Sequence, residues 1–341
     1  MDNCNSCCCF HIRMKMKRIY PSSNPYGNAF NAARLREACE IYKKMIKDDA
    51  TICLTLAGAL TPAGLGGSVI ELIKRGLIDF IISTGANLYH DIHFALDLPV
   101  YRGSYDVDDR ELEREGIVRI YDVFIPMETL LETDRYLQRI LDIEGRFSTA
   151  ELHYYIGKKL LDDAEKPEAS ILATAAKYDL PIYCPSPGDS SIGMNIAYLR
   201  GKGKRISTDI EKDVLETASI IYASNKSGGI ILGGGAPKNF FMQTQPMLSQ
   251  ILSLPEKGHD YFIQITSDAP HYGGLSGATA SEAISWKKID AKSKTHVTIY
   301  GDATIITPLL FKKVMRMKRE HKRLYQKRKE FLKELMDKVK N

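Results

Sequence analysis

The sequence predicts an α/β protein built on a doubly wound, mainly parallel sheet. Short apolar runs of strand length alternate with longer segments of helix length along most of the chain, an order typical of parallel sheets with helices on both faces. Most of the apolar runs end in clusters of glycine, aspartate, serine and threonine. A chain of 341 residues can bury a substantial core, and we expect a single domain over 18–310.

The first half of the chain begins this alternation. The segment 28–47 has helical character, and the apolar run 50–56 is typical of a buried strand. This strand leads into AGALTPAGLGG at 57–67, whose small residues let a ligand approach the backbone closely. The further elements that we expect are a helix at 68–75, a strand at 80–83, a loop at 84–91, a strand at 117–121, and helices at 127–141, 148–161 and 168–177.

The second half repeats the pattern, and its strands again end in polar and glycine residues. A short helix at 281–285 follows a Gly-Ala-Thr start. The strands that we expect lie at 182–184 before the loop 185–193, at 229–232 before the glycines 233–235, at 261–266 and at 297–300.

The polar strand ends predict where a ligand binds. In open α/β sheets, ligands lie outside the carboxyl ends of the strands, and the polar clusters at five such ends favour a nucleotide. Neither a G-x-G-x-x-G fingerprint nor a Walker P-loop occurs. The triple glycine before Lys238 is either a phosphate cradle or a tight structural turn. The clusters lie at 58–67, 84–91, 189–193, 233–239 and 302–304.

The C-terminal segment 311–341 carries most of the positive charge. It has thirteen Lys or Arg against four Asp or Glu, a net +9, which leaves −4 for the rest of a chain whose total is +5. Apolar residues recur in it at helical spacing, so we expect a basic amphipathic helix that packs one stripe on the core. Contact with nucleic acid or an acidic membrane is the alternative, but no recognised binding fold accompanies the charge, and we expect neither partner.

Cysteines are concentrated at the N-terminus. Cys4, Cys7, Cys8 and Cys9 precede His11, but no second ligand pair follows at zinc-finger spacing, so a disordered leader over 1–17 is favoured over a zinc site. We therefore expect no metal. The remaining cysteines stand in apolar surroundings and are interpreted as reduced core residues: Cys39, Cys53 and Cys184.

The chain has neither an apolar run of membrane-spanning length nor a signal-peptide pattern at its N-terminus. We expect a cytoplasmic protein.

The segment 276–289, SGATASEAISWKKI, is the strongest candidate for chemistry. It holds the single tryptophan, Trp286, with Glu282 one helical turn before it and Lys288 two residues after it. An indole face and a carboxylate suit an alkyl ammonium ion. Lys288 acts as a nucleophile only when neutral, and repulsion from Lys287 favours that state. The alternative is a core tryptophan flanked by solvated lysines.

This segment resembles the active-site stretch of deoxyhypusine synthases, with the pattern Ser-Gly-Ala, then Glu-Ala, then Ser-Trp-Gly-Lys. The resemblance places Lys288 on the lysine that carries a covalent imine, Trp286 on the tryptophan that covers the substrate, and Glu282 on a substrate-binding glutamate. Ser276 opens the motif at the substrate site. Lys287 replaces the glycine of the family.

Further blocks of the same resemblance occur in the family's order from about residue 50 to 310. They imply a Rossmann-like architecture that binds NAD, assembled as a homotetramer with sites at the dimer interface. The residues that the resemblance assigns to NAD are Thr84, Asp189, Gly233, Gly234, Gly235, Asp302 and Ala303.

Four positions depart from the family pattern. Met194 and Leu275 stand where acidic residues grip the polyamine, Asn239 where a histidine handles protons, and His90 where a glutamate lies beside the cofactor. Either His90 takes over the proton work, or it caps a loop. Asn239 is either part of the catalytic set or a partner for backbone groups after the glycine turn.

The sequence thus predicts a divergent deoxyhypusine synthase-like enzyme, an NAD-dependent aminoalkyl transferase. The resemblance implies a polyamine-like donor and a lysine-imine intermediate, and the acceptor is a small amine or a protein lysine. An NAD-dependent amine dehydrogenase and a non-catalytic regulatory homologue are the alternatives.

Overall fold

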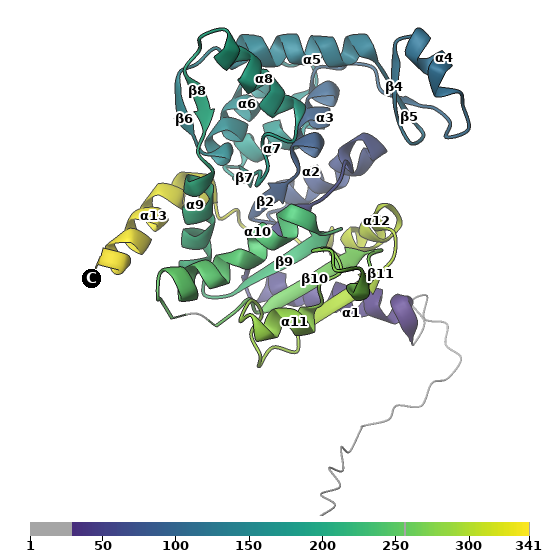
Figure 1. Ribbon diagram of the computed structural model, residues 1–341. Coiled ribbons are helices and arrows are strands. Elements are labelled where there is room, and N and C mark those ends of the chain that lie inside the picture. The colour runs from purple at the N-terminus through teal and green to yellow at the C-terminus, as the bar shows by residue number, and fades with distance from the viewer. Residues whose placement is uncertain (1–28, 256, 341) are drawn as a thin grey trace, which may run out of the picture.

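A computed structural model describes residues 29–255 and 257–340 (Figure 1). The predicted leader at 1–17 lies outside these residues. Among the helices that the structure describes, none is long and apolar enough to cross a membrane.

A six-stranded sheet in the order β11-β10-β9-β1-β2-β7 forms the centre of the protein. Every neighbouring pair in it is parallel, which confirms the predicted doubly wound α/β fold. Its strands are β1 (Thr51–Leu56), β2 (Phe80–Ser83), β7 (Ile182–Tyr183), β9 (Ser227–Leu232), β10 (Tyr261–Thr266) and β11 (His296–Tyr300).

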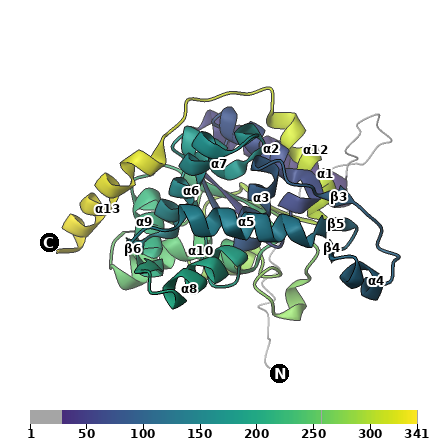
Figure 2. The same ribbon diagram turned by 90° about the horizontal axis from the view of Figure 1, so that it is seen from above.

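Helices cover both faces of this sheet, which explains why its strands are apolar without alternation. Ile52 and Leu54 contribute to one hydrophobic core, and Cys53, on the opposite face of β1, contributes to the other. The first core packs under α1 (Phe30–Lys47), α2 (Gly66–Lys74) and α12 (Ala303–Val314), and the second under α9 (Ile210–Tyr222) and α10 (Gly235–Pro246) (Figures 1 and 2).

A second group of helices lies at the β7 side of the sheet (Figure 1). It consists of α3 (Gly85–Ala95), α5 (Met127–Ile140), α6 (Thr149–Asp163), α7 (Ile171–Lys177) and α8 (Ser191–Gly201). The short elements elsewhere are α4 (Asp109–Arg114), α11 (Ala280–Ser285), the π-helical turns Thr61–Leu65 and Met247–Ile251, and the 3₁₀ turns Pro167–Ala169 and Pro270–Tyr272.

Two small sheets accompany the main one. β3 (Tyr101–Arg102), β5 (Val123–Pro126) and β4 (Ile117–Ile120) form an antiparallel sheet, and β6 (Gly145–Phe147) pairs with β8 (Ile206–Thr208). The strand predicted at 117–121 exists, but it belongs to the antiparallel sheet and not to the parallel alternation.

Several predicted loops are helical. The segment 84–91 is the start of α3, with Thr84 at its N-cap position, so the predicted loop there is wrong. Helices α8, α9 and α10 were not predicted, and α8 and α10 begin inside segments interpreted as ligand loops. Part of the loop predicted at 57–67 is the π-helical turn Thr61–Leu65.

The C-terminal segment is not one helix. Helix α12 ends at Val314, and α13 (Leu324–Lys340) begins ten residues later. The residues between them, 315–323, form a segment without helix or strand that we call the strap; Figure 2 shows it joining the two helices. Arg319 in the strap donates to the carbonyl oxygens of Gly76 and Ala50 at 2.9 and 2.7 Å, next to the amino ends of β2 and β1. These tertiary contacts outweigh the helical pattern.

Candidate active site

The strand order has a reversal between β1 and β9. The chain moves from β1 toward β7 in its first half and from β9 toward β11 in its second, and ligands of open sheets bind where the connections diverge in this way. At the carboxyl ends of these two strands, the Ala57 amide donates to the Leu232 carbonyl at 3.1 Å. The predicted ligand loops after β1 and β9 therefore lie side by side.

Asn87 fixes the loop after β1, and sequence reasoning missed it. Its fully buried side chain accepts hydrogen bonds from the amides of Leu60 and Thr61 at 2.6 and 3.0 Å and donates to the Gly58 carbonyl at 3.2 Å. Thr84 donates to the same carbonyl at 2.6 Å. The start of α3 therefore shapes the backbone at the strand reversal.

The glycine turn after β9 is held by the next strand and by Ser276. The Ser276 hydroxyl accepts a hydrogen bond from the Gly235 amide at 3.0 Å, and Gln264 donates to the carbonyls of Gly233 and Ser276 at 2.9 and 2.7 Å. A Cβ atom at Gly234 would lie 2.4 Å from the Cα of Ser276. Gly234 is thus required by packing, and Ser276 braces the turn.

A cavity of about 350 Å³ lies between α10, α11 and the segment that leads into α11. It brings together four residues that the sequence singled out: Lys288, Trp286, Glu282 and Asn239. The Lys288 Nζ atom lies 3.5 Å from Asn239 Oδ1 and 5.3 Å from the centre of the Trp286 ring. The other lining residues are Lys238, Met242, Gln243, Phe262, Leu275, Ala278, Thr279 and Ala283.

Trp286 is 61% exposed. The alternative of a core tryptophan flanked by solvated lysines is therefore wrong. Its indole forms part of an open cavity wall and is free to lie against a bound cation.

Both ends of α11 are capped, and the caps orient the cavity side chains. At the N-terminus, Thr279 accepts from the Glu282 amide and Glu282 accepts from the Thr279 amide, a capping box. At the C-terminus, the amides of Lys287 and Lys288 bond to the carbonyls of Ile284 and Ala283, both at 2.9 Å, the pattern of a Schellman motif. This motif directs Lys288 back toward the cavity.

Lys287 has a φ of +55°, the left-handed conformation that the Schellman motif requires after the helix and that glycine adopts without strain. We expect Lys287→Gly to stabilise the protein by about 1 kcal/mol, because a side chain in this conformation costs roughly 1–2 kcal/mol and glycine loses part of the gain through unfolded-chain entropy. Urea unfolding midpoints measure the effect. Lys287→Ala keeps the strain and should show no gain; equal midpoints for the two variants would contradict this account.

Burial favours the neutral amine of Lys288. Removal from water lowers the pKa of its ammonium group from the ordinary value, because burial penalises the charged form. Lys287 is exposed and is not among the causes of this shift. The expected repulsion between the adjacent lysines is therefore not what favours the neutral amine.

Lys238 is a second lysine in the cavity, whereas the sequence indicated a role for it only at the glycine turn. Lys238 is 5% exposed, and its Nζ donates to Gln264 Oε1 at 3.0 Å and to the Ala278 carbonyl at 2.6 Å. Burial lowers its pKa to about 8. Its ammonium group therefore points toward β10 and the cavity that contains Lys288. It does not point outward as a phosphate ligand of the glycine turn.

The remaining predicted residues lie away from the cavity. His90 is inside α3, where its Nδ1 lies 3.1 Å from the Nε2 of His93, and its predicted position at a strand end is wrong. Met194 is exposed on α8. Asp189 lies in the loop after β7, and Asp302, next to Ala303, caps α12 by accepting from the Thr304 amide at 2.7 Å.

Within the described part of the chain, no three His, Cys, Asp or Glu side chains are grouped to hold a metal.

The family model for deoxyhypusine synthase matches residues 24–314. A "deoxyhypusine synthase-like protein" from Nostoc punctiforme is 46% identical over 91% of this chain and 83% of its own length. A "probable deoxyhypusine synthase 2" from Methanosarcina mazei is 39% identical over 82% of this chain and 81% of its own. The crystal structure of a protein assigned as a deoxyhypusine synthase from Entamoeba histolytica shares the fold, with a TM-score of 0.58 and 20% identity over 86% of this chain and 91% of its own.

Proposed function

Because the chain belongs to the deoxyhypusine synthase family, we propose that it is an NAD-dependent aminoalkyl transferase that holds the transferred group as an imine on Lys288. The observation that carries this proposal is the partly buried Lys288, whose pKa is lowered by burial, in one cavity with Trp286 and Glu282. A lysine in such surroundings is prepared to act as a nucleophile.

The cavity residues divide the work between binding and bond formation. The Trp286 face and the Glu282 carboxylate hold a cationic alkyl amine. The neutral Lys288 amine attacks the electrophilic carbon of the donor, the donor's leaving amine departs, and an acceptor amine later displaces the lysine. Asn239 accepts a hydrogen bond from Lys288 and orients its nitrogen.

The residues around the strand reversal fit NAD. Gly58 and Gly235 adopt positive φ angles of 61° and 57°, and no atom of the described residues lies within 4 Å of the position where a Cβ would stand. The N-termini of α3 and α10 also lie there, and helix N-termini favour phosphate groups. When bound, NAD would accept a hydride from the amine-bearing carbon of the donor and return it to the product.

The two aspartates assigned to NAD stand at opposite edges of the sheet. Asp189 follows the edge strand β7 and Asp302 follows the edge strand β11, so five strand spacings, about 24 Å, separate them. One dinucleotide would have to extend along the whole row of strand ends to contact both. Thr84 and the glycines 233–235 are therefore the stronger candidates for the cofactor site.

The exposed apolar residues at the cavity support an assembly with sites at a subunit interface. Trp286 and Leu275, which line the cavity, are 61% and 50% exposed, and Tyr272 nearby in the chain is 71% exposed. Apolar side chains grouped at an opening are typical of surfaces that a partner covers. A homotetramer of the kind implied by the family resemblance would cover them.

The test is incubation of the purified protein with NAD and a panel of mono-, di- and polyamines, followed by borohydride reduction and peptide mass analysis. The proposal predicts a transient NADH absorbance and an aminoalkyl adduct on Lys288, without net accumulation of NADH. Net accumulation with turnover would instead identify an amine dehydrogenase. If NAD binds and no amine yields either signal, the protein is a non-catalytic homologue.

Among the described residues that line the cavity, Glu282 is the one carboxylate, which suits a donor or acceptor held at one cationic end. We expect Leu275→Glu to lower the KM for a diamine or polyamine roughly 10- to 100-fold, since a hydrogen bond to a charged group contributes about 1.5–3 kcal/mol. Leu275→Gln has nearly the same size without the charge and should change KM little. Equal KM values for the two variants would show that residue 275 does not face the substrate.

A further inference from the structure

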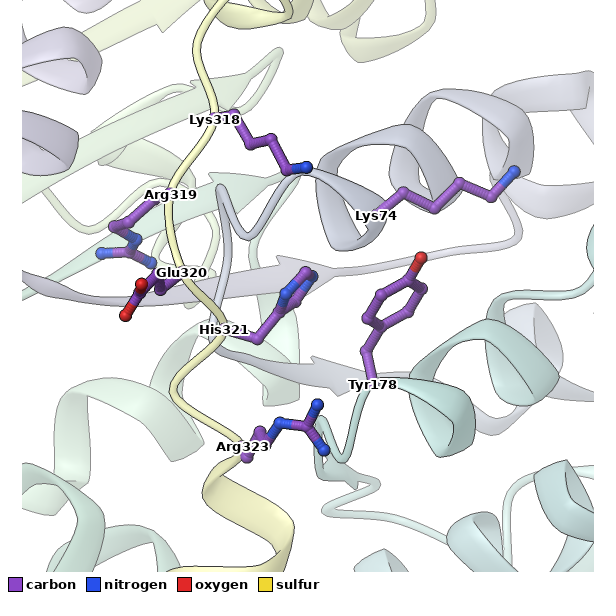
Figure 3. Close-up of a pocket in the computed structure, with 7 residues that line it drawn as sticks. All are labelled: Lys74, Tyr178, Lys318, Arg319, Glu320, His321 and Arg323. Carbon is purple, nitrogen blue, oxygen red and sulfur yellow. The ribbon is translucent and has the colours of Figure 1, made fainter.

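An open pocket of about 600 Å³ lies on the strap (Figure 3). Lys74 of α2, Tyr178 at the end of α7, and the strap residues Lys318, His321 and Arg323 border it. The strap crosses next to the amino ends of β1 and β2, and this pocket shares no lining residue with the Lys288 cavity. The family model's match ends at residue 314, before the strap.

The pocket presents hydrogen-bond donors without matching acceptors. In the part of the chain that the structure describes, neither the Lys318 ammonium group nor the Tyr178 hydroxyl has a hydrogen-bond or ion-pair partner. Arg323 uses its Nη1 atom on Asp179 at 3.1 Å, which leaves its other N–H groups. Such a set suits a ligand that only accepts hydrogen bonds.

The acidic groups nearby do not neutralise this set. Glu320 is the one carboxylate that borders the pocket, and Figure 3 shows it projecting with Arg319 to one side of the strap, while Lys318 and His321 project to the other, toward Lys74 and Tyr178. Among the described residues, Lys74 has only an exposed contact with Glu71, at 3.5 Å. The local field is therefore positive on this side of the strap.

The strap is pinned on both sides of the pocket. The Arg319 amide donates to the Arg75 carbonyl at 2.9 Å, and the buried Asp79 accepts from the Arg319 guanidinium at 2.7 Å. The His321 Nε2 atom bonds to the Ile73 carbonyl at 2.8 Å while its ring stacks on Tyr178, with ring centres 4.4 Å apart. Held in this way, the backbone that carries the cationic side chains needs little further ordering to bind a ligand.

From these observations we infer a second ligand site, formed by the strap with α2 and α7, that binds the phosphate chain of an oligophosphate. Phosphate oxygens accept hydrogen bonds only, carry the charge that the donors lack, and pair well with both lysine and arginine. The volume of about 600 Å³ is larger than one phosphate needs, which favours a chain of two or three. Binding would tie the strap to α2 and α7, and so hold α13 to the domain.

The test is calorimetric titration of the full-length protein with inorganic triphosphate at moderate salt. We expect Lys318→Ala to weaken binding about tenfold or more, and Lys312→Ala, which removes the same charge from an exposed position on α12, to leave it unchanged. Raising the KCl concentration should weaken binding. Equal affinities of the two variants, or no binding at millimolar triphosphate, would overturn the inference. Both lysines are exposed, so both variants should fold.

A parallel titration with ATP distinguishes the source of the phosphate chain. Affinity equal to that of triphosphate assigns the site to a free oligophosphate, and tighter binding that is still lost in Lys318→Ala assigns it to a nucleotide. ATP binding that is insensitive to Lys318 belongs to the dinucleotide region at the other edge of the sheet and counts against the strap site.

Discussion

Replacing Lys288 with alanine is expected to lower aminoalkyl transfer by about 10³-fold or more, because the variant lacks the nucleophile that carries the transferred group. Lys288→Arg should lose as much, since a guanidinium group stays charged at any working pH. Both variants should keep their unfolding midpoint and their affinity for NAD, because Lys288 is only partly buried and, among the described residues, its side chain has one hydrogen bond, to Asn239 at 3.5 Å. Single-turnover formation of product measures the loss.

The matched control is Lys287→Gly, which removes the neighbouring ammonium group and relaxes the backbone at that position. It should retain transfer. The pH dependence of adduct formation in the unmodified protein gives a second readout: the trapping rate should rise with pH as Lys288 loses its proton, with a midpoint below the ordinary lysine pKa of 10.5. A midpoint at or above this value would show that burial does not prepare the lysine.

The candidate active-site segment could be singled out from the sequence because its residues are close together in the chain. Glu282, Trp286 and Lys288 lie within seven residues, and a single short helix with two local caps orients them. The six parallel strands could also be predicted from the sequence, because strands buried on both faces are continuous apolar runs and differ clearly from the polar residues at their ends. Contiguous patterns therefore predicted both the sheet and the centre of the cavity.

The errors come from polar residues that serve distant parts of the fold. The segment 84–91 resembled a loop because it contains Asn87 and Asp91, yet both side chains are fully buried. Asp91 accepts hydrogen bonds from the amides of Ile171 and Leu172 at 2.7 and 3.0 Å, so it caps a helix about eighty positions away. A single sequence does not show such partners, and it therefore does not separate a buried polar helix from a surface loop.

The prediction of one C-terminal helix was wrong for a related reason. Its apolar residues do pack on the core, and Leu324 and Leu335 are buried. Two basic residues of the segment make specific internal contacts that the predicted single helix did not include: Arg319 at the amino ends of β1 and β2, and Arg328 in α13. Those contacts break the helix at the strap and fix α13 in its place against α9.

Arg328 gives the largest expected effect on stability. It is 4% exposed, its Nη2 lies 3.1 Å from Glu151 Oε1, and its Nε lies 3.4 Å from Oε1 of the fully buried Glu216. We expect Arg328→Met to cost about 3–5 kcal/mol of unfolding free energy, because removing one partner of a buried ion pair leaves the other charge uncompensated. Urea unfolding followed by far-UV circular dichroism measures the loss, and the exposed Lys327→Ala on the same helix should lie within about 0.5 kcal/mol of the parent.

The double variant Arg328→Met with Glu216→Gln separates a charge effect from a packing effect. Burial raises the pKa of Glu216, and Arg328 opposes that rise. A carboxyl group whose pKa is raised in the folded state stabilises the protein at low pH and loses that contribution as the pH rises through its folded pKa. The single variant should therefore be penalised more at pH 8 than at pH 5, and the double variant should recover stability at pH 8. A penalty that is independent of pH and unchanged by Glu216→Gln would mean that Arg328 acts through its packing on Tyr325 and not through its charge.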